Sequence, residues 1–384
     1  MPEAEPPKRT WNLYLIALLS FLFIGLLLLI CWLLFWQFRE STDDSYVAGN
    51  MILITPQESG IITTILTDNT QLVVEGQPLV ELDRHDYEIA LDRSKADLAS
   101  KVRTVEQLFL KVNELEAKKE GAEASLVQAS LDYDHRAALV ADKSVSLEDF
   151  EHSVTTLAAS LAFLKEVEKQ LESARAEVQG TTLATHPLIE FSKAELRQSF
   201  LALHRCQVLA PTRGIITQRR AQVGQWVTAH DPLMALVPID EIWVDANFRE
   251  VSLKHLRIGQ KVTLIADMYG SDVQYHGRLV GLNPGSGSVF SILPPQNATG
   301  NWIKIVQRIP VKISLDPDEL LQHPLVLGLS MTVYVDTHDR SGRQLPNTLP
   351  SQPIYSSNIY RDELAGVEPL IEQIILENQS NAAE

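Results

Sequence analysis

The sequence predicts an elongated α+β protein. Its expected parts are a single-pass membrane anchor, a β-domain split into two segments, a long antiparallel α-helical coiled-coil hairpin and an antiparallel β-barrel. Three observations predict this class: one uncharged apolar run near the N-terminus, a β-type repeat whose two copies lie far apart in the chain, and a seven-residue apolar period between the two copies. A length of 384 residues allows about two to three domains.

Composition excludes several classes of protein. The chain has 49 acidic against 33 basic residues and a net charge of −16, so we expect no nucleic-acid partner, since such binding needs basic patches. Two cysteines exclude a disulfide-rich scaffold and a four-cysteine zinc site. Cys31 lies in the apolar run and Cys206 far outside it, so no disulfide is expected between them.

The apolar run predicts the anchor. Leu13–Trp36 carries no charge, and a helix of this length spans about 36 Å, enough for a hydrocarbon core. Lys8 and Arg9 precede it, so residues 1–12 are predicted to be cytoplasmic and 13–36 to cross the membrane. A cleaved signal peptide is the alternative. It fits less well, because the run is too long and no small-residue cleavage site follows it.

The repeat predicts one compact β-domain. Residues 60–82 and 214–236 align without a gap, with nine identities in 23 positions. Each copy resembles short strands separated by glycine and proline. One copy alone would leave strand edges uncovered, so the two copies should close on each other. We therefore predict a β-domain built from 44–85 and 207–237.

The insertion between the copies predicts the hairpin, over residues 86–206 with its tip at 140–146. Apolar residues recur every seven positions, which is typical of a left-handed coiled coil. Gly180–Pro187 breaks the return helix and should bulge outward while the pairing resumes. The outgoing seam holds Leu91, Leu98, Val105, Val112, Leu126, Tyr133 and Val140, with Leu108, Leu115, Ala122 and Ala129; the return seam holds Phe150, Leu157, Leu164, Leu171 and Val178, with Val154 and Leu161 between.

The C-terminal third is predicted to form the barrel. Residues 238–340 alternate strand-like runs with turn signals, which favours an antiparallel β-barrel. Residues 341–384 are predicted to be a linker followed by a short amphipathic helix over 359–378.

No catalytic signature is present. The chain contains no GxxxxGK[ST], HExxH, GxSxG or CxxC motif, and its histidines are scattered. We therefore expect no enzyme, no cofactor and no metal site. Lipoyl and biotinyl carrier domains also consist of two β-halves, but they present a modified lysine on a tight turn between the halves. The hairpin occupies that position here, which argues against a carrier.

The order of the parts resembles the membrane fusion (periplasmic adaptor, HlyD-like) family of bacterial export pumps. Residues 43–49 resemble the segment that enters the family's lipoyl-like domain, and 209–214 the start of its second half. Residues 243–250, 294–302 and 304–311 resemble barrel stretches of the family's multidrug-export members. The resemblance covers roughly residues 40–378.

The resemblance implies a role without catalysis. A family member would be a homo-oligomeric adaptor, anchored in the inner membrane of a Gram-negative bacterium with its bulk in the periplasm. It would bridge a major-facilitator drug transporter to a TolC-like outer-membrane channel. The alternative within the family is an adaptor of a peptide or protein (type I-like) exporter. Outside it, a carrier or enzyme using the β-domain and a coiled coil that merely spaces membranes remain open.

The resemblance also implies a channel contact at the hairpin tip. The family carries an Arg, a Leu four residues later and a Ser seven beyond that. Leu139 and Ser146 match this spacing, whereas the Arg position holds His135 and Arg136 stands one residue late. The resemblance therefore implies Arg136, Leu139 and Ser146 as the channel-contact residues. The alternative is structural: Leu139 would cover the end of the seam, and Ser146 would cap the return helix.

A second candidate contact lies in the barrel. The segment 285–302 is polar and rich in turn residues, with Phe290, Asn297 and Trp302 as its candidate contact residues. It would contact the transporter or the next protomer, or else be an ordinary long barrel loop. No residue is assigned to drug binding.

Overall fold

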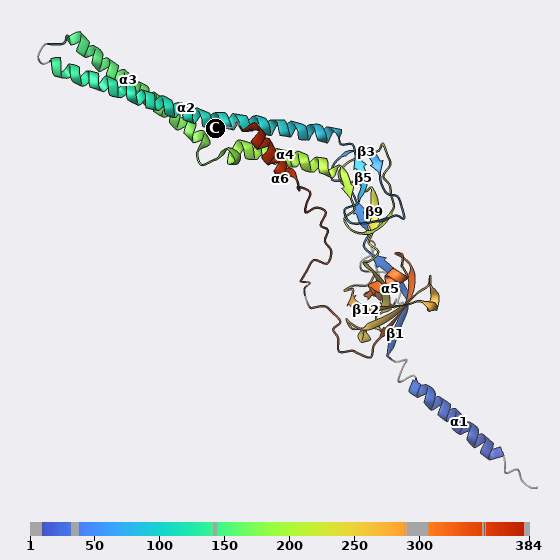
Figure 1. Ribbon diagram of the computed structural model, residues 1–384. Coiled ribbons are helices and arrows are strands. Elements are labelled where there is room, and N and C mark those ends of the chain that lie inside the picture. Colours follow the sequence, from blue (N-terminus) through green and yellow to red (C-terminus); the bar gives the residue numbers. More distant parts are fainter. Residues whose placement is uncertain are drawn as a thin grey trace, which may run out of the picture.

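The computed structural model describes residues 10–31, 38–140, 144–287, 289, 306–347, 349 and 351–379. The molecule is elongated: a helical hairpin extends from one end, two β-units follow, and helix α1 (Thr10–Cys31) lies at the other end (Figure 1). The predicted hairpin, split β-domain and barrel are all present.

The other helices and strands form the hairpin, the two β-units and the C-terminal segment. The helices are α2 (His85–Val140), α3 (Leu147–Val178), α4 (Pro187–Arg205), α5 (Pro317–Gln322) and α6 (Val367–Asn378), with short 3-10 turns η2 (Leu183–Thr185), η3 (Leu253–His255) and η4 (Gly270–Asp272). The strands are β1 (Arg39–Gly49), β2 (Ile52–Ile54), β3 (Gly60–Ile65), β4 (Leu72–Val73), β5 (Pro78–Leu82), β6 (Gln207–Leu209), β7 (Gly214–Thr217), β8 (Trp226–Val227), β9 (Met234–Val237), β10 (Ile242–Arg249), β11 (Lys261–Ala266), β12 (Gln274–Leu282), β13 (Arg308–Leu315) and β14 (Ser330–Asp336).

Helix α1 overlaps the predicted anchor. It has 22 residues, and its large apolar side chains from Tyr14 to Leu28 are exposed. Searched over the described ranges, the chain has no helix that is both long enough and apolar enough to cross a membrane. Residues 1–9 and 32–37 lie outside those ranges. The span over 13–36 stays a prediction.

The two repeats exchange short strands. One sheet has the order β2-β9-β7-β4 and the other β6-β5-β3-β8. Strand β4 of the first repeat thus pairs with β7 of the second, while β8 of the second pairs with β3 of the first. One hydrophobic core is shared, with buried side chains from both halves, among them Ile62, Leu79, Leu82, Ile216, Leu233 and Leu236. Neither half can complete its sheet alone.

The repeat also reappears in backbone conformation. Thr70 and Gly224 occupy equivalent positions in the two copies, and both adopt positive φ values, of 70° and 83°. The same holds for the equivalent pair Gly76 and His230, at 78° and 75°. Each pair therefore has one glycine and one residue whose Cβ is strained in the left-handed region. The turn geometry is kept even where glycine is not.

We expect Thr70→Gly to raise the free energy of unfolding by roughly 0.5–1 kcal/mol, because relief of left-handed strain exceeds the entropy that glycine adds to the unfolded chain. Urea unfolding of the full-length protein measures this. The reciprocal change Gly224→Thr is the control and should destabilise, since no atom within 4 Å blocks a Cβ there and only strain is introduced. A stability loss for Thr70→Gly would contradict the expectation.

The hairpin seam follows the predicted rows on α2, where both rows point inward. On α3 the row Phe150, Leu157, Leu164, Leu171 and Val178 also points inward. The placement of Val154 and Leu161 in the seam is wrong: they are 41% and 53% exposed. The second inward row is instead Ser153, Ser160, Val167 and Ala174. Positions three residues after the first row face α2, and here they hold mostly small side chains.

The break in the return helix has a local cause. Gly180 adopts φ +72°, and Pro187 begins α4 at a position where its missing N–H costs nothing. The His186 side chain accepts a hydrogen bond from Leu188 N as the helix cap. Helix α4 then resumes packing on α2, with Ile189 and Leu196 fully buried. The connection leaves the line of the helices, as predicted (Figure 1).

The barrel is closed by a strand from the other end of the chain. Its order is β1-β10-β13-β12-β11-β14. The prediction that residues 44–49 enter the split β-domain is therefore wrong: β1 pairs with β10 and β14 over that stretch. Val47 packs in the barrel core and Ser45 is fully buried. A barrel made from 238–340 alone would have two open edges, and β1 covers both.

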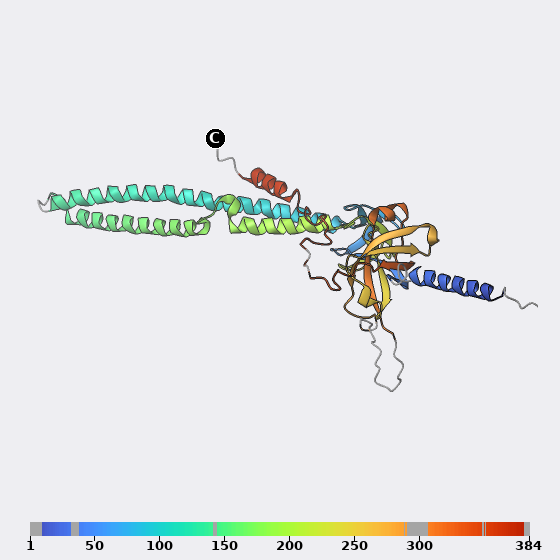
Figure 2. The ribbon, with the colours of Figure 1, turned by 90° about the horizontal axis from the view of Figure 1, so that it is seen from below.

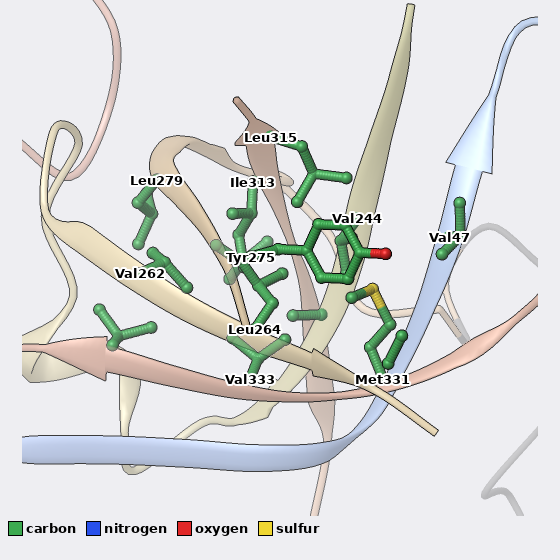
Figure 3. Packing of buried hydrophobic residues seen from close by; sticks show 14 of the residues in the cluster. Val47, Val244, Val262, Leu264, Tyr275, Leu279, Ile313, Leu315, Met331 and Val333 are labelled. Atoms are coloured by element: carbon green, nitrogen blue, oxygen red, sulfur yellow. The ribbon is translucent and has the colours of Figure 1, made fainter. Parts of the chain in front are cut away.

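The barrel interior is filled by a hydrophobic core. Figure 3 shows Tyr275 at its centre among Val244, Leu264, Ile313 and Met331. The Tyr275 hydroxyl donates a hydrogen bond to the His323 backbone oxygen at 2.9 Å. Burial raises the pKa of Tyr275 to about 12. The interior is therefore filled rather than open as a binding cavity.

The C-terminal helix is shorter than predicted. Helix α6 covers Val367–Asn378, and the residues before it from 359 form turns. Gly366, with φ +93°, directly precedes it. Its buried residues are Val367, Ile371, Ile374 and Ile375, which lie against the hairpin.

Candidate functional site

The hairpin tip is formed where α2 ends at Val140 and α3 begins at Leu147. Ser146 is the N-cap of α3: its hydroxyl accepts a hydrogen bond from Asp149 N at 3.1 Å and donates one to the Asp149 carboxylate at 2.6 Å. Ser144 N donates to the Leu139 backbone oxygen at 3.1 Å. The capping alternative for Ser146 is thereby confirmed, and it leaves the hydroxyl at the exposed end of the hairpin. Residues 141–143 lie outside the described part.

Arg136 holds the two helices together at the tip. Its Nη1 donates to the Asp149 backbone oxygen at 2.9 Å, and its Nε lies 3.2 Å from Asp132 Oδ1. Its side chain is only 32% exposed. His135, at the position of the family's arginine, is exposed. Arg136 therefore acts within the chain as a clamp on the first turn of α3.

The exposed surface of the tip combines two leucines with Ser146 and the carboxylates of Glu148 and Asp149. Leu139 is 44% and Leu147 is 66% exposed. Behind them the rings of Tyr133 and Phe150 lie 5.7 Å apart and close the seam. The sequence analysis missed Leu147. Its position could have indicated its exposure, because it follows the cap directly and stands three residues before Phe150, outside the inward row. The tip therefore exposes two leucines close to a small polar group and two carboxylates.

Other features of the described chain do not form a site. A hollow of about 860 Å³ on the barrel is lined by the cations of Arg39, Lys261 and Arg278 together with the carboxylates of Asp316 and Asp336. Within the described ranges, no three His, Cys, Asp or Glu side chains are grouped to hold a metal ion. Phe290, Asn297 and Trp302 lie outside the described residues.

Cys206 is buried at the base of the hairpin. Burial raises the pKa of its thiol to about 11, with the nearby Glu58 carboxylate adding to the effect. The thiol is free and packs in the core of the split β-domain. It therefore serves as a small core residue rather than as a nucleophile.

The chain is similar in sequence to known proteins. Residues 85–206 match a family model described as EMRA, alpha-helical hairpin domain. The chain is 42% identical over 349 residues to the multidrug export protein EmrA of Escherichia coli, covering 91% of this chain and 90% of the relative. It is 41% identical over 297 residues to the fatty acid resistance protein FarA of Neisseria gonorrhoeae, covering 77% and 75%. The solved structure of the periplasmic adaptor protein EmrA matches with a TM-score of 0.38 at 21% identity, covering 78% of this chain and 99% of that one.

The relatives are named for multidrug export and fatty acid resistance, and the matched structure is that of a periplasmic adaptor protein. This chain belongs to the membrane fusion (periplasmic adaptor) family, in the group of the multidrug export protein EmrA.

Proposed function

We propose that this chain is the periplasmic adaptor of a tripartite multidrug efflux pump. It joins an inner-membrane major-facilitator transporter of the EmrB type to a TolC-like outer-membrane channel. The observation that carries the proposal is the match over 91% of the chain to a protein named for multidrug export. Helix α2, with 56 residues, would reach about 84 Å from the β-domain toward that channel.

Each part has an assigned task in this proposal. Residues 13–36 anchor the chain in the inner membrane, with residues 1–12 in the cytoplasm and the bulk in the periplasm. The hairpin tip, with Leu139 and Ser146 at its surface and Arg136 holding its shape, contacts the channel. The segment 285–302, including Phe290, Asn297 and Trp302, contacts the transporter or a neighbouring protomer of a homo-oligomer. The chain performs no catalysis; energy coupling lies in the transporter.

Accumulation in a strain that lacks the gene tests this function. The panel contains a hydrophobic dye, an uncoupler and a long-chain fatty acid, the last because the relative FarA is named for fatty acid resistance. We expect all or part of the panel to accumulate above the parent level, and wild-type complementation to reverse the effect. Unchanged accumulation of every compound would contradict drug export and direct attention to secreted peptides or proteins.

A further inference from the structure

The C-terminal segment 337–379 connects the barrel with the hairpin (Figures 1 and 2). It leaves the barrel after β14, and its first part is fastened there. Ile258 N donates to the Arg343 backbone oxygen at 2.8 Å, and the Gln344 side chain donates to the Leu253 backbone oxygen at 2.9 Å. Further along, Asn358 N donates to the Glu75 carboxylate of the split β-domain at 2.9 Å. The segment thus contacts two β-units before it reaches the hairpin.

Helix α6 has a hydrophobic seat on the hairpin base. Val367 and Ile371 are 0% and 2% exposed, and they pack in one cluster with Leu98 and Leu196 of α2 and α4. Leu183, in the break between α3 and α4, packs against the same cluster. The seat therefore covers the part of the hairpin where the return helix is interrupted.

Three arginines of the hairpin hold the segment by polar contacts. Arg197 donates to both carboxylate oxygens of Glu368, at 2.6 and 3.0 Å, a bidentate geometry that fixes direction as well as distance. Arg205 lies 2.8 Å from Glu363, whose side chain is only 11% exposed. Arg103 donates to the Asn378 side chain at 2.7 Å. The hydrogen bond from Arg197 lowers the pKa of Glu368, so this carboxylate is ionised at neutral pH.

The barrel and the split β-domain are otherwise joined by two short connections. Residues 50–51 link β1 to β2, and residues 238–241 link β9 to β10. Both crossings lie at the same junction, so by themselves they leave bending about that junction free. The C-terminal segment is a third connection. It runs from the barrel past the split β-domain, away from the two short connections, and ends on the hairpin.

We propose that the C-terminal segment is a tether that limits the range of directions the hairpin can take relative to the barrel, with the α6 seat as its anchor point. Its middle part, residues 345–356, can extend over at most about 45 Å between Gln344 and Ser357. Leu349 and Ile354 in this part are 93% and 72% exposed, so packing does not fix these two residues. The tether therefore limits how far the hairpin swings away from the barrel while α6 stays seated.

Pulsed electron paramagnetic resonance on the full chain in detergent tests the tether. Spin labels replace the exposed residues Glu120 on α2 and Asp272 on the barrel, in a background without Cys31 and Cys206. We expect one narrow distance distribution for the otherwise wild-type chain. Ile371→Asp should unseat α6 and broaden the distribution toward longer distances. Glu368→Arg should broaden it too.

Two matched variants separate the seat from a general effect of charge. The double change Arg197→Glu with Glu368→Arg restores the ion pair and should restore the narrow distribution. Glu372→Arg makes the same charge change at an exposed position of α6 and should leave the distribution narrow. An unchanged distribution after Ile371→Asp and Glu368→Arg would overturn the proposal. So would rapid amide hydrogen exchange of α6 in the wild-type chain, which does not depend on any variant.

Discussion

A strain that carries Ser146→Lys is expected to accumulate the pump's compounds as strongly as a strain without the gene, although the protein folds. The substitution places a long charged side chain at the exposed tip that also carries Leu139 and Leu147, where the proposed channel contact lies. It also removes the hydroxyl that caps α3, which costs about 0.5–2 kcal/mol. Export assays, with far-UV circular dichroism of the purified protein, measure both effects.

Two further variants separate docking from capping. Ser146→Ala loses the same cap but adds no bulk, so export should remain. Ala158→Lys adds the same charged side chain on the exposed face of α3, away from the tip, and should also export. Normal export by Ser146→Lys would refute the tip contact. Equal loss with Ser146→Ala would mean that the serine acts only through its cap.

Leu171→Ala is expected to lower the free energy of unfolding of the hairpin by about 2–4 kcal/mol. Leu171 is 4% exposed and lies in the inward row of α3, so its truncation leaves a cavity against α2. Leu161→Ala makes the same chemical change at a residue that is 53% exposed, and it should cost no more than about 0.5 kcal/mol. Urea unfolding followed by circular dichroism compares the two.

The pair of variants tests the register of the seam. If Leu161→Ala destabilised the hairpin as much as Leu171→Ala, α3 would be rotated relative to the arrangement described here. Equal and small effects would show that the coiled coil is held mainly by its base.

Regular patterns in the sequence predict most of the fold. The distant repeat locates the split β-domain, and the regular apolar spacing locates the hairpin, because both signals extend over many positions. The register of α3 is predicted only in part. Val154 and Leu161 suggest seam positions, whereas the true second row uses Ser153 and Ser160. Small side chains give no hydrophobic signal even where they are buried.

Contacts between distant segments could not be predicted in the same way. Strand β1 looks like an entry to the next domain, because it directly precedes it in the sequence, yet its partners β10 and β14 both lie beyond the hairpin, in the C-terminal part of the chain. Helix α6 packs on the hairpin base. Its amphipathic pattern predicts that one face is buried, but it does not indicate which surface covers that face. At the tip, the spacing located Leu139 and Ser146, but the clamp made by Arg136 depends on the backbone of α3.

The exchange of β4 and β8 between the two repeats dictates an order of events during synthesis. The first repeat leaves the ribosome with its β3 edge unpaired, and β8, which covers it, follows only after the whole hairpin. Within the helices between them, most contacts join residues that lie one helical turn apart in the sequence. Because such contacts are local, these helices can form early and quickly. When the hairpin closes, the second repeat comes close to the first. The effective loop between the pairing strands is then shorter, so its closure costs less entropy. The long insertion thus acts as an assembly aid for the small domain that it interrupts.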